Sequence, residues 1–447
     1  MSPISASFYD NPSYSLLVTG VTGTEGKSTT VYLIWQLLTL LGKKTGFFST
    51  VQQCFGDEVI FNSEHQTTPE APVVQRFLRQ MLDNGCEYAV VEASSHGLSP
   101  KTNRLGDVNF CSAVFTNITH EHMEFHETFD QYREDKANLF RALDKYVPAT
   151  GEGKLNLNNP FGVINCDDRN ARFFAKTTQQ KTFMFSAAGR DGDVIIEAIE
   201  SSSQGNWYVM HLPALNKRIE LRDKLPGAFN SGNVLAALLT VSNLLYLPIY
   251  EITPFVKKLK PVHGRMTTIN SGQNFEVIVD YAHTPSSFQA VFPPLRARID
   301  KTGGKIISVF GSAGERDTQK RPEQGKIAAE YSDIVILTDE DPRGEDSMSI
   351  LENIAAGVTA VGVTTVGVTT IGVTSDELQE QKIFTRGENL FLIPDRAAAI
   401  RKAISLANAG DIVIFLGKGH ENSIIYKDKV MPFNEIAEVE KALQEAR

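Results

Sequence analysis

Residues 15–30 read Ser-Leu-Leu-Val-Thr-Gly-Val-Thr-Gly-Thr-Glu-Gly-Lys-Ser-Thr-Thr, an apolar strand that runs into a glycine-rich turn. The apolar stretch 31–41 that follows predicts a helix. A strand, closely spaced glycines and a helix that begins with Lys-Ser are typical of a loop that binds nucleotide phosphates. The usual pattern has a glycine at the position of Val21, so this loop is a variant that lacks the first glycine.

The residue types of this loop suit a nucleoside triphosphate with Mg²⁺. Glycines let backbone N–H groups approach phosphate oxygens, Lys27 can reach the terminal phosphates, and the Ser28 hydroxyl is a ligand for magnesium. An ordinary strand-to-helix turn is the alternative interpretation. We expect the nucleotide site to include Gly23, Thr24, Gly26, Lys27, Ser28 and Thr29.

Composition excludes several classes of protein. The 447 residues suit two or three domains, and a net charge of −9 argues against a general nucleic-acid binder or a basic membrane-surface protein. The four cysteines lie far apart, which favours reduced core residues over a zinc site or disulfides. There is no leader-like N-terminus and no apolar run of about 20 residues, so we expect a cytoplasmic protein with small-molecule substrates and no membrane contact.

Short β-rich runs alternate with helical stretches along most of the chain, which predicts parallel sheets flanked by helices. The runs are 88–92, 111–116, 162–165, 306–310, 334–337 and 412–415. Residues 181–221 hold closely spaced β-prone runs and predict a small antiparallel ribbon. A helix is interrupted near 260–265, so we expect an α/β chain with a phosphate-loop domain at 1–262 and a Rossmann-like domain at 263–447.

Residues 357–375 repeat Gly-Val-Thr-Thr-Val at a period of five. Valine and threonine favour a strand, whereas a glycine at every fifth position interrupts it. A surface insertion is the interpretation that we favour over a structured functional element.

A second candidate cluster begins with Glu92, at the end of the apolar strand 88–92. Parallel sheets gather ligands beyond the carboxyl ends of their strands, so this carboxylate is expected beside the phosphate loop, where it can face Mg²⁺. A partly exposed glutamate with no role is the alternative.

Three histidines follow the strand at 111–116. A zinc protease helix needs glutamate directly after the first of two histidines four apart; His122 and His126 have that spacing, but Met123 takes the glutamate position. We therefore expect His122 near phosphate and magnesium, and His120 and His126 as polar loop or surface residues. Lys136 lies in the helical stretch 129–140 and by spacing alone is a surface lysine.

The order of these and later motifs resembles the Mur ligase family, most closely the branch that makes UDP-N-acetylmuramoyl-tripeptide. The resemblance covers nearly the whole chain. Besides the segments above it includes Thr67-Thr68-Pro69-Glu70, residues 92–96, Thr116-Asn117, residues 132–140, residues 227–230 with Asn233, Gly264-Arg265-Met266, residues 280–285, residues 311–321, Asp341-Pro342-Arg343 and residues 417–421.

The resemblance implies that ATP phosphorylates a substrate carboxylate and that the amine of an amino acid then attacks the acyl phosphate. It implies catalytic roles for Lys27, His122, Lys136 and Arg265, with magnesium on Ser28, Glu92, His122 and Lys136, the last carbamylated by CO₂. By the same resemblance Asn117 positions phosphate, Asn230 and Asn233 line the adenine pocket, and Arg265, Asp280 and His283 approach ATP from the second domain.

The resemblance also assigns the substrates. Thr67, Thr68 and Ser95 match residues on the diphosphate or sugar side of a UDP-muramoyl dipeptide. Arg316, Asp341, Pro342, Arg343, Gly417 and Glu421 match residues that hold the incoming amino acid. Arginine can pair a carboxylate and Glu421 or Asp341 an ammonium, so a diamino acid is favoured. The family's usual Asp-Asn is Glu340-Asp341 here, which leaves meso-diaminopimelate, lysine and ornithine open.

The phosphate loop begins by residue 20, so we expect this chain to lack the N-terminal domain that usually holds the UDP end. We accordingly expect that a partner chain can supply the UDP-binding function and that the protein is otherwise a monomer. The favoured function is addition of a diamino acid to UDP-N-acetylmuramoyl-Ala-Glu. The alternatives are a related ligase on a folyl or poly-γ-glutamate acceptor and a noncatalytic, nucleotide-gated binding module.

Overall fold

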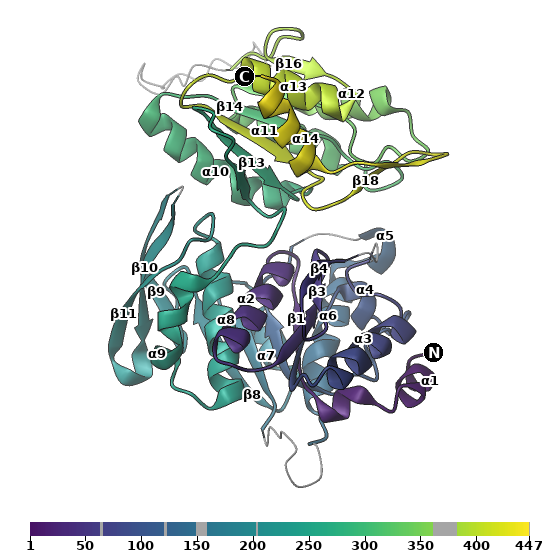
Figure 1. Ribbon diagram of the computed structural model, residues 1–447, viewed down its shortest axis with the longest axis vertical. Helices are drawn as coiled ribbons and strands as arrows, with labels where there is room; N and C mark the ends of the chain where they lie inside the picture. Colours follow the sequence, from purple (N-terminus) through teal and green to yellow (C-terminus); the bar gives the residue numbers. More distant parts are fainter. Residues whose placement is uncertain (63–65, 120–122, 149–158, 203, 361–381, 447) are drawn as a thin grey trace, which may run out of the picture. The chain divides into compact units, whose positions relative to one another are not determined.

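The computed structural model describes residues 1–62, 66–119, 123–148, 159–202, 204–360 and 382–446. The chain divides into two compact units, Met1–Val262 and His263–Arg447, each with its own sheet. Figure 1 shows helices beside both sheets. The predicted α/β class is confirmed for both units.

The first unit is built on an eleven-stranded sheet in the order β11-β10-β9-β8-β7-β6-β1-β5-β2-β3-β4. Its strands are β1 Leu17–Thr22, β2 Thr45–Phe48, β3 Gln52–Cys54, β4 Val59–Phe61, β5 Tyr88–Glu92, β6 Phe110–Phe115, β7 Phe161–Asn165, β8 Lys181–Ser186, β9 Val194–Ser202, β10 Gly205–Leu212 and β11 Lys217–Arg222. The seven adjacent strands β9, β8, β7, β6, β1, β5 and β2 pair in parallel with their neighbours in this series. Parallel strands put all their carboxyl ends on one edge, which is where the phosphate loop follows β1.

The described helices of this unit are α1 Ser2–Phe8, α2 Lys27–Leu40, α3 Ala71–Asp83, α4 Ser95–Leu98, α5 Met123–His126, α6 Phe129–Leu143, α7 Ala171–Ala175, α8 Asn230–Leu245 and α9 Ile249–Ile252, with 3-10 turns at Pro12–Ser15, Pro213–Leu215 and Thr253–Lys258. The apolar residues of α2 and α8 form one buried core with the sheet. Those of α3 and α6 form a second core with other strand residues. Helices thus cover the strands on two sides, as buried parallel sheets require.

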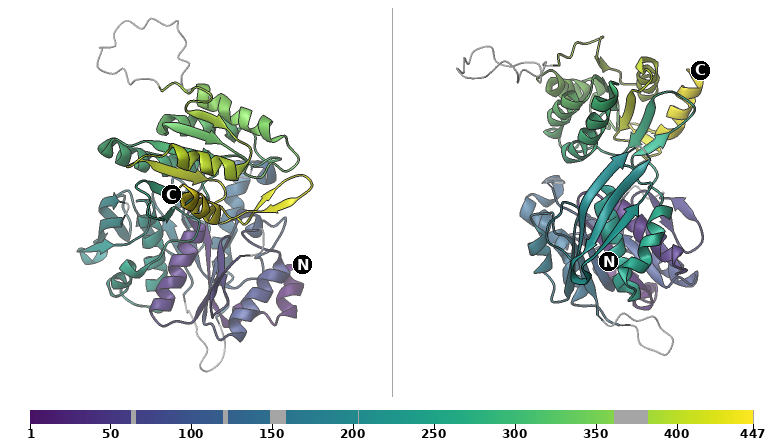
Figure 2. Two further views of the ribbon diagram at one scale, coloured as in Figure 1. Left: turned by 45° about the horizontal axis from the view of Figure 1, so that its top comes forward. Right: turned by 90° about the vertical axis from the view of Figure 1, so that its left-hand side faces the viewer.

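The predicted ribbon at 181–221 is only partly antiparallel. Strands β9, β10 and β11 pair antiparallel, and Figure 2 shows these teal strands side by side as a long ribbon. However, β8 pairs in parallel with β7, and β9 pairs in parallel with β8. The ribbon is therefore a continuation of the main sheet, because β8 and the start of β9 extend its parallel part.

The second unit has a six-stranded sheet in the order β12-β13-β17-β14-β15-β16. Its strands are β12 Thr267–Ile269, β13 Glu276–Asp280, β14 Ile306–Phe310, β15 Ile334–Leu337, β16 Leu390–Leu392 and β17 Ile412–Leu416, with a separate hairpin of β18 Ser423–Ile425 and β19 Val430–Pro432. All pairs except that of the edge strand β12 are parallel. Residues of α10 Pro285–Thr302, α11 Lys320–Tyr331 and α12 Ser347–Ala360 form one core, and those of α13 Arg396–Leu406 and α14 Glu435–Glu445 form another. This layered arrangement is Rossmann-like, as predicted.

Two sequence interpretations need correction here. The repeat does not begin as an insertion, because Gly357 and Val358 are buried in the last turn of α12 and a Cβ on Gly357 would lie 1.8 Å from the Pro322 carbonyl oxygen. Most of the repeat lies outside the described residues. Among the cysteines, which are all free, Cys166 is only half-buried.

Within the described ranges, no single helix is long and apolar enough to cross a membrane, although the bent pair Asn230–Leu245 and Ile249–Lys258 meets the length and composition test together.

Candidate functional site

The phosphate loop is packed so tightly that two of its positions require glycine. A Cβ on Gly23 would lie 1.9 Å from the Thr116 hydroxyl oxygen, and one on Gly26 would lie 2.6 Å from Asn233 Oδ1. Gly26 also has φ of +82°, in the left-handed region. The backbone of this loop can thus bend into a cradle whose N–H groups face an anion, with α2 starting at Lys27.

The segment after β6 braces the loop. The Asn117 side chain accepts a hydrogen bond from the Glu25 N–H (2.9 Å) and donates to the Glu25 carbonyl (3.1 Å). The Thr116 hydroxyl donates to the same carbonyl (2.6 Å), and the Asn117 carbonyl accepts from Thr24 N–H (2.8 Å). Both ends of the Asn117 amide are thus engaged by the backbone of Glu25, so Asn117 fixes the conformation of the loop.

Two lysines donate hydrogen bonds to neighbouring carbonyls of the loop. Lys27 Nζ donates to the Thr24 carbonyl (2.6 Å), so its side chain folds back over the loop. Lys136 Nζ donates to the Gly23 carbonyl (2.6 Å) and lies 4.5 Å from the ring centre of Tyr132. Lys136 is only 2% exposed, which contradicts its interpretation from spacing as a surface lysine. It sits on the sheet-facing side of α6, with Tyr132 one turn before it.

The Glu92 carboxylate is oriented beside this loop. Strand pairing places Glu92 opposite Val21, the second-last residue of β1, as expected. Its carboxylate accepts from the Thr50 N–H (2.8 Å) and from the Thr50 hydroxyl (3.0 Å). Glu92 is buried, so the alternative of a partly exposed strand-end glutamate is wrong. The sequence analysis missed Thr50, although it follows β2, which neighbours β5.

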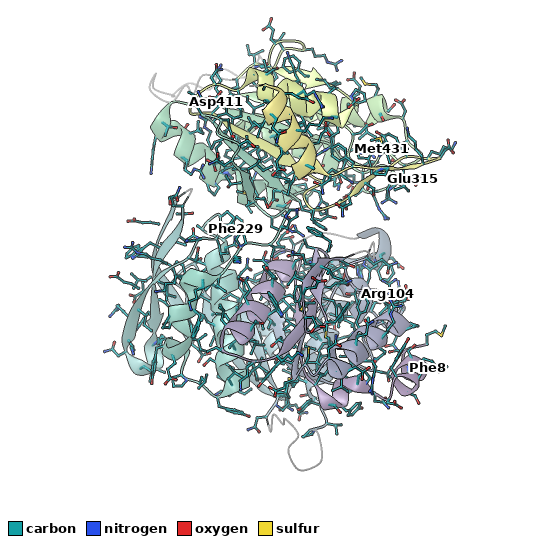
Figure 3. All side chains as sticks on the ribbon, viewed as in Figure 1. Phe8, Arg104, Phe229, Glu315, Asp411 and Met431 are labelled. Atoms are coloured by element: carbon teal, nitrogen blue, oxygen red, sulfur yellow. The ribbon has the colours of Figure 1, made fainter. Side chains whose placement is uncertain are left out.

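The residues expected on the acceptor side lie next to Glu92. The Thr67 and Thr50 hydroxyl oxygens are 3.0 Å apart. The Thr68 hydroxyl donates to the Glu92 carbonyl (2.9 Å) and accepts from Ser94 N–H (3.0 Å). Arg104, labelled in Figure 3, donates to the Thr68 carbonyl (2.8 Å). The Thr-Thr-Pro segment is thus fixed to the turn that follows β5.

His126 is a buried residue, not the surface histidine predicted. Its Nε2 lies 3.0 Å from Ser95 Oγ and its Nδ1 lies 2.9 Å from Asp135 Oδ2, and it is 1% exposed. Gln131 donates to the other oxygen of Asp135 (2.9 Å). This Ser95–His126–Asp135 chain joins α4, α5 and α6. His120 and His122 lie outside the described residues.

Asn230 and Asn233 stand in the first turn of α8, beside the phosphate loop. Asn233 Oδ1 accepts from the Thr30 hydroxyl (3.2 Å), and its Nδ2 donates to Asn230 Oδ1 (2.9 Å). Asn230 Nδ2 donates in turn to the Pro226 carbonyl (2.7 Å). The two amides form a polar chain against Gly26 and the start of α2, which suits the edge of a nucleotide site.

These residues fit ATP and Mg²⁺ by their chemistry. Magnesium prefers oxygen ligands, and the first turn of α2 and the end of β5 supply the Ser28 hydroxyl and the Glu92 carboxylate. The neighbouring glycine-rich cradle supplies N–H donors for phosphate. Within the described residues, no group of three or more His, Cys, Asp or Glu side chains is arranged so that it could hold a metal ion by itself.

In the second unit, Asp280 ends β13 and is held by backbone. Its carboxylate accepts from Met266 N–H and Ala282 N–H, each at 2.7 Å. Burial raises the pKa of Asp280, while the charge of Arg265 acts in the opposite direction. The Arg265 guanidinium lies 4.6 Å from the ring centre of Tyr281, and His283 Nδ1 is 2.9 Å from the Tyr281 carbonyl. Arg265, Asp280 and His283 thus gather around one loop.

The residues expected at the amino-acid site gather beyond β15 and β17. Lys418 pairs with Asp341 Oδ1 (2.8 Å) and with Glu421 Oε2. Asp341 also accepts from Ile425 N–H (2.9 Å), and the Tyr281 hydroxyl donates to Glu421 Oε1 (3.2 Å). The sequence analysis missed Lys418 and Tyr281 as partners, although both lie inside the quoted motifs.

Arg343 differs from these residues because its guanidinium forms no ion pair with any residue that the structure describes. Its backbone N–H donates to the Ile425 carbonyl (2.9 Å), which fixes the segment Asp341–Arg343 to β18, and its Nε is buried with no hydrogen-bond partner among the described residues. Arg316, in contrast, is exposed and is not gathered into the cluster. Pro342 and Gly417 are buried in the two loops that carry the charged residues.

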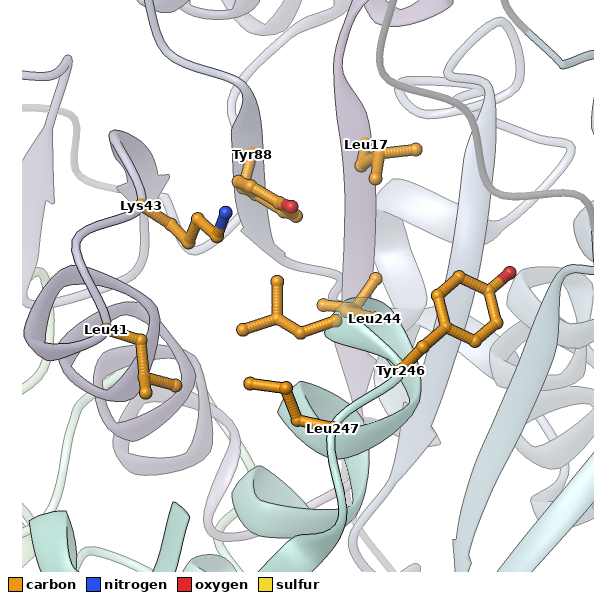
Figure 4. A pocket seen from close by; sticks show the side chains of 8 residues that line it. Leu17, Leu41, Lys43, Tyr88, Leu244, Tyr246 and Leu247 are labelled. Atoms are coloured by element: carbon orange, nitrogen blue, oxygen red, sulfur yellow. The ribbon is translucent and has the colours of Figure 1, made fainter. Parts of the chain in front are cut away.

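A separate pocket lies at the opposite edge of the first sheet. Figure 4 shows it between the amino-terminal ends of β1 and β5 and the end of α8, with Leu17, Lys43, Tyr88 and Leu244 among its lining residues. It contains none of the residues expected to handle phosphate, so it is not the candidate site.

Comparisons with known proteins agree with this geometry. Residues 21–241 match the Mur ligase middle domain, and residues 264–419 match the Mur ligase glutamate ligase domain. The chain is 53% identical over 450 residues to a UDP-N-acetylmuramyl-tripeptide synthetase of Treponema denticola, covering 99% of this chain and 79% of that one. It is 33% identical to a UDP-N-acetylmuramoyl-L-alanyl-D-glutamate–2,6-diaminopimelate ligase of Clostridium tetani, covering 98% and 80%. A solved structure of a ligase of that second name shares 27% identity with a TM-score of 0.60, covering 96% of this chain and 79% of that one.

Proposed function

Since this chain belongs to the Mur ligase family, we propose that it is an ATP-dependent ligase of peptidoglycan precursor synthesis. It joins a diamino acid to UDP-N-acetylmuramoyl-L-alanyl-D-glutamate and releases ADP and phosphate. The observation that carries the proposal is the braced phosphate loop at the same strand edge as the oriented Glu92 carboxylate. That pairing suits phosphoryl transfer from a bound nucleotide.

The reaction needs two steps because a carboxylate is a poor electrophile. An oxygen of the acceptor carboxylate first bonds to the γ-phosphorus of ATP, and the bond to ADP breaks. The amine of the amino acid then bonds to the carbonyl carbon, loses a proton to solvent, and phosphate leaves with the acceptor oxygen. Both steps move charge on phosphoryl oxygens, so fixed positive groups near those oxygens lower the barrier.

The first unit supplies those groups. The loop N–H donors from Gly23 to Ser28 cradle the phosphates, and Lys27 leaves the Thr24 carbonyl to reach the terminal ones. Ser28, Glu92 and His122 would hold Mg²⁺, which neutralises phosphate charge when bound. Two hydrogen bonds from Thr50 fix the orientation of the Glu92 carboxylate. Asn230 and Asn233 hold the base side of the nucleotide, and Arg265, Asp280 and His283 contribute from the second unit.

We assign a carbamate to Lys136. A carbamylated lysine adds anionic oxygens that can face a metal. The carbamate nitrogen keeps one N–H, so the hydrogen bond to the Gly23 carbonyl is retained. The observed contact is therefore compatible with the modification.

The second unit supplies selectivity for the amino acid. The Arg343 guanidinium can pair with a carboxylate of the substrate. The side chain of Glu421 is 31% exposed, so its carboxylate can also accept hydrogen bonds from an ammonium of the substrate. A substrate end that carries both charges fits this pair, so meso-diaminopimelate is preferred over lysine and ornithine. Asp341, Pro342, Gly417 and Arg316 complete the proposed site, while Thr67, Thr68 and Ser95 contact the acceptor.

The test is phosphate release by the purified chain with ATP, Mg²⁺ and UDP-N-acetylmuramoyl-L-alanyl-D-glutamate. The panel contains meso-diaminopimelate, lysine, ornithine and no amino acid, and a second acceptor panel contains folate and γ-glutamyl peptides. We expect release that depends on both substrates and is fastest with meso-diaminopimelate. Phosphate release with only the folyl or glutamyl acceptors would refute the proposed acceptor. ATP binding without any substrate-stimulated phosphate release would refute the proposed ligase activity.

A further inference from the structure

Lys418 is a fully buried lysine directly after Gly417, at the end of β17. Lysine is almost never fully buried unless a counter-charge accompanies it. The residues around it all lie within the second unit, and its side chain points into the cluster of carboxylates expected to meet the amino acid.

The lysine is bound by two carboxylates at once. Its ammonium donates to Asp341 Oδ1 at 2.8 Å and to Glu421 Oε2. Burial acts to lower the pKa of Lys418, but the charges and hydrogen bonds of Glu421 and Asp341 outweigh it, and the pKa is raised above its ordinary value. The group is therefore a fixed positive charge at neutral pH.

Charge balance around the proposed site depends on this lysine. Glu340 adds a third carboxylate, since its Oε2 is buried without a partner among the described residues and would lie 3.0 Å from a Cβ on Gly417. Arg343 adds the second cation. Whatever the other charges nearby, loss of the Lys418 ammonium makes this cluster more negative by one unit charge.

We propose that Lys418 is a specificity-determining residue for the amino-acid substrate: it cancels one carboxylate charge, so that the site selects a zwitterionic distal end over a purely cationic one. The inference rests on the proposed function. meso-Diaminopimelate carries an ammonium and a carboxylate at its distal end, whereas lysine carries an ammonium alone. A more negative site attracts the second type of end more strongly and repels the carboxylate of the first.

The experiment measures kcat/KM for meso-diaminopimelate and for lysine, and takes their ratio. Lys418→Met, which keeps the length of the side chain but removes its charge, should lower this ratio about tenfold, as expected for one unit charge near the ligand. Asp341→Asn makes the site less negative by one charge and should raise the ratio by a similar factor. Lys418→Arg keeps the charge and should leave the ratio within about twofold.

Opposite shifts from two variants in one cluster are the signature of charge, because damage to the fold lowers both rates together. Asp411→Asn is the matched control: Asp411, labelled in Figure 3, is equally buried and accepts from Lys305 N–H and Asn408 N–H (each 2.8 Å) away from the cluster. It should lower stability and leave the ratio unchanged.

The outcomes separate the two claims. A wild-type chain that uses neither amino acid refutes the proposed function itself. An active wild type whose ratio is unmoved in Lys418→Met, or moves in the same direction in Lys418→Met and Asp341→Asn, overturns the inference. If Lys418→Met does not fold, Asp341→Asn still tests the inference. An unchanged or lower ratio of the two kcat/KM values in that variant would overturn it.

Discussion

Lys136 is the residue in which sequence spacing and structure differ most. Spacing on a helix gave no reason to bury it, yet its amine lies under the phosphate loop on the Gly23 carbonyl. Its burial becomes intelligible only from the tertiary position of α6, which packs against the sheet behind the loop. A residue placed there lies against the loop that is expected to bind phosphate.

Lys136→Ala should lower kcat of ligation about 100-fold, because it removes a charged group from the phosphate side of the site. Added formate should restore part of the rate, since a small carboxylate can occupy the place of the carbamate. Phosphate release at saturating substrates, with and without formate, measures both effects.

Lys43→Ala is the control for this variant, because Lys43 lines the pocket at the opposite edge of the sheet and should tolerate the change. Full activity of Lys136→Ala would refute the catalytic assignment. A large loss of activity that no carboxylate restores would contradict only the carbamate on Lys136 and would leave its catalytic role intact.

At the scale of elements, three helices are tied together by one buried imidazole. His126 in α5 bridges Ser95 in α4 and Asp135 in α6, the residue just before Lys136. This bridge connects the turn that carries an expected acceptor residue to the helix that carries the expected catalytic lysine. The position of α6 relative to the turn after β5 therefore depends on it.

His126→Ala should lower the free energy of unfolding of the first unit by about 2–4 kcal/mol, because it leaves a cavity and unpairs two buried polar groups. Urea unfolding followed by tryptophan fluorescence measures this unit alone, since both tryptophans, Trp35 and Trp207, belong to it. A change under about 0.5 kcal/mol is the behaviour of a surface histidine and would contradict the bridge.

The sequence located many of these elements well but not their side-chain contacts. Strands β5, β14 and β15 match the predicted runs, because short apolar runs between turns encode a buried parallel strand directly. The direction of β8 and β9 was not readable, since closely spaced β-prone runs do not specify whether neighbours pair in parallel. Thr50 follows β2, and only the sheet order, in which β2 neighbours β5, brings it to Glu92. Lys418 lies within the predicted segment 417–421, but its pairing with Asp341 depends on the loop after β15.

At the scale of the whole molecule, each unit has its candidate functional residues at the carboxyl ends of the parallel strands in its own sheet. In the first unit these are the phosphate loop, Glu92 and Asn117, and in the second they are Asp280, Asp341 and Lys418. This placement followed from strand order and could be anticipated from the alternation of strands and helices. The edge in the first unit suits a nucleotide and the edge in the second unit suits an amino acid. A ligase that uses both substrates needs both kinds of site.

The most direct test of the central claim follows one oxygen atom. UDP-N-acetylmuramoyl-L-alanyl-D-glutamate labelled with ¹⁸O in the reacting glutamate carboxylate is incubated with the chain, ATP, Mg²⁺ and meso-diaminopimelate, and phosphate and product are analysed by mass spectrometry. Ligation through an acyl phosphate predicts one ¹⁸O atom in each released phosphate and one equivalent of tripeptide. Phosphate released without the label, or without tripeptide, would contradict the account.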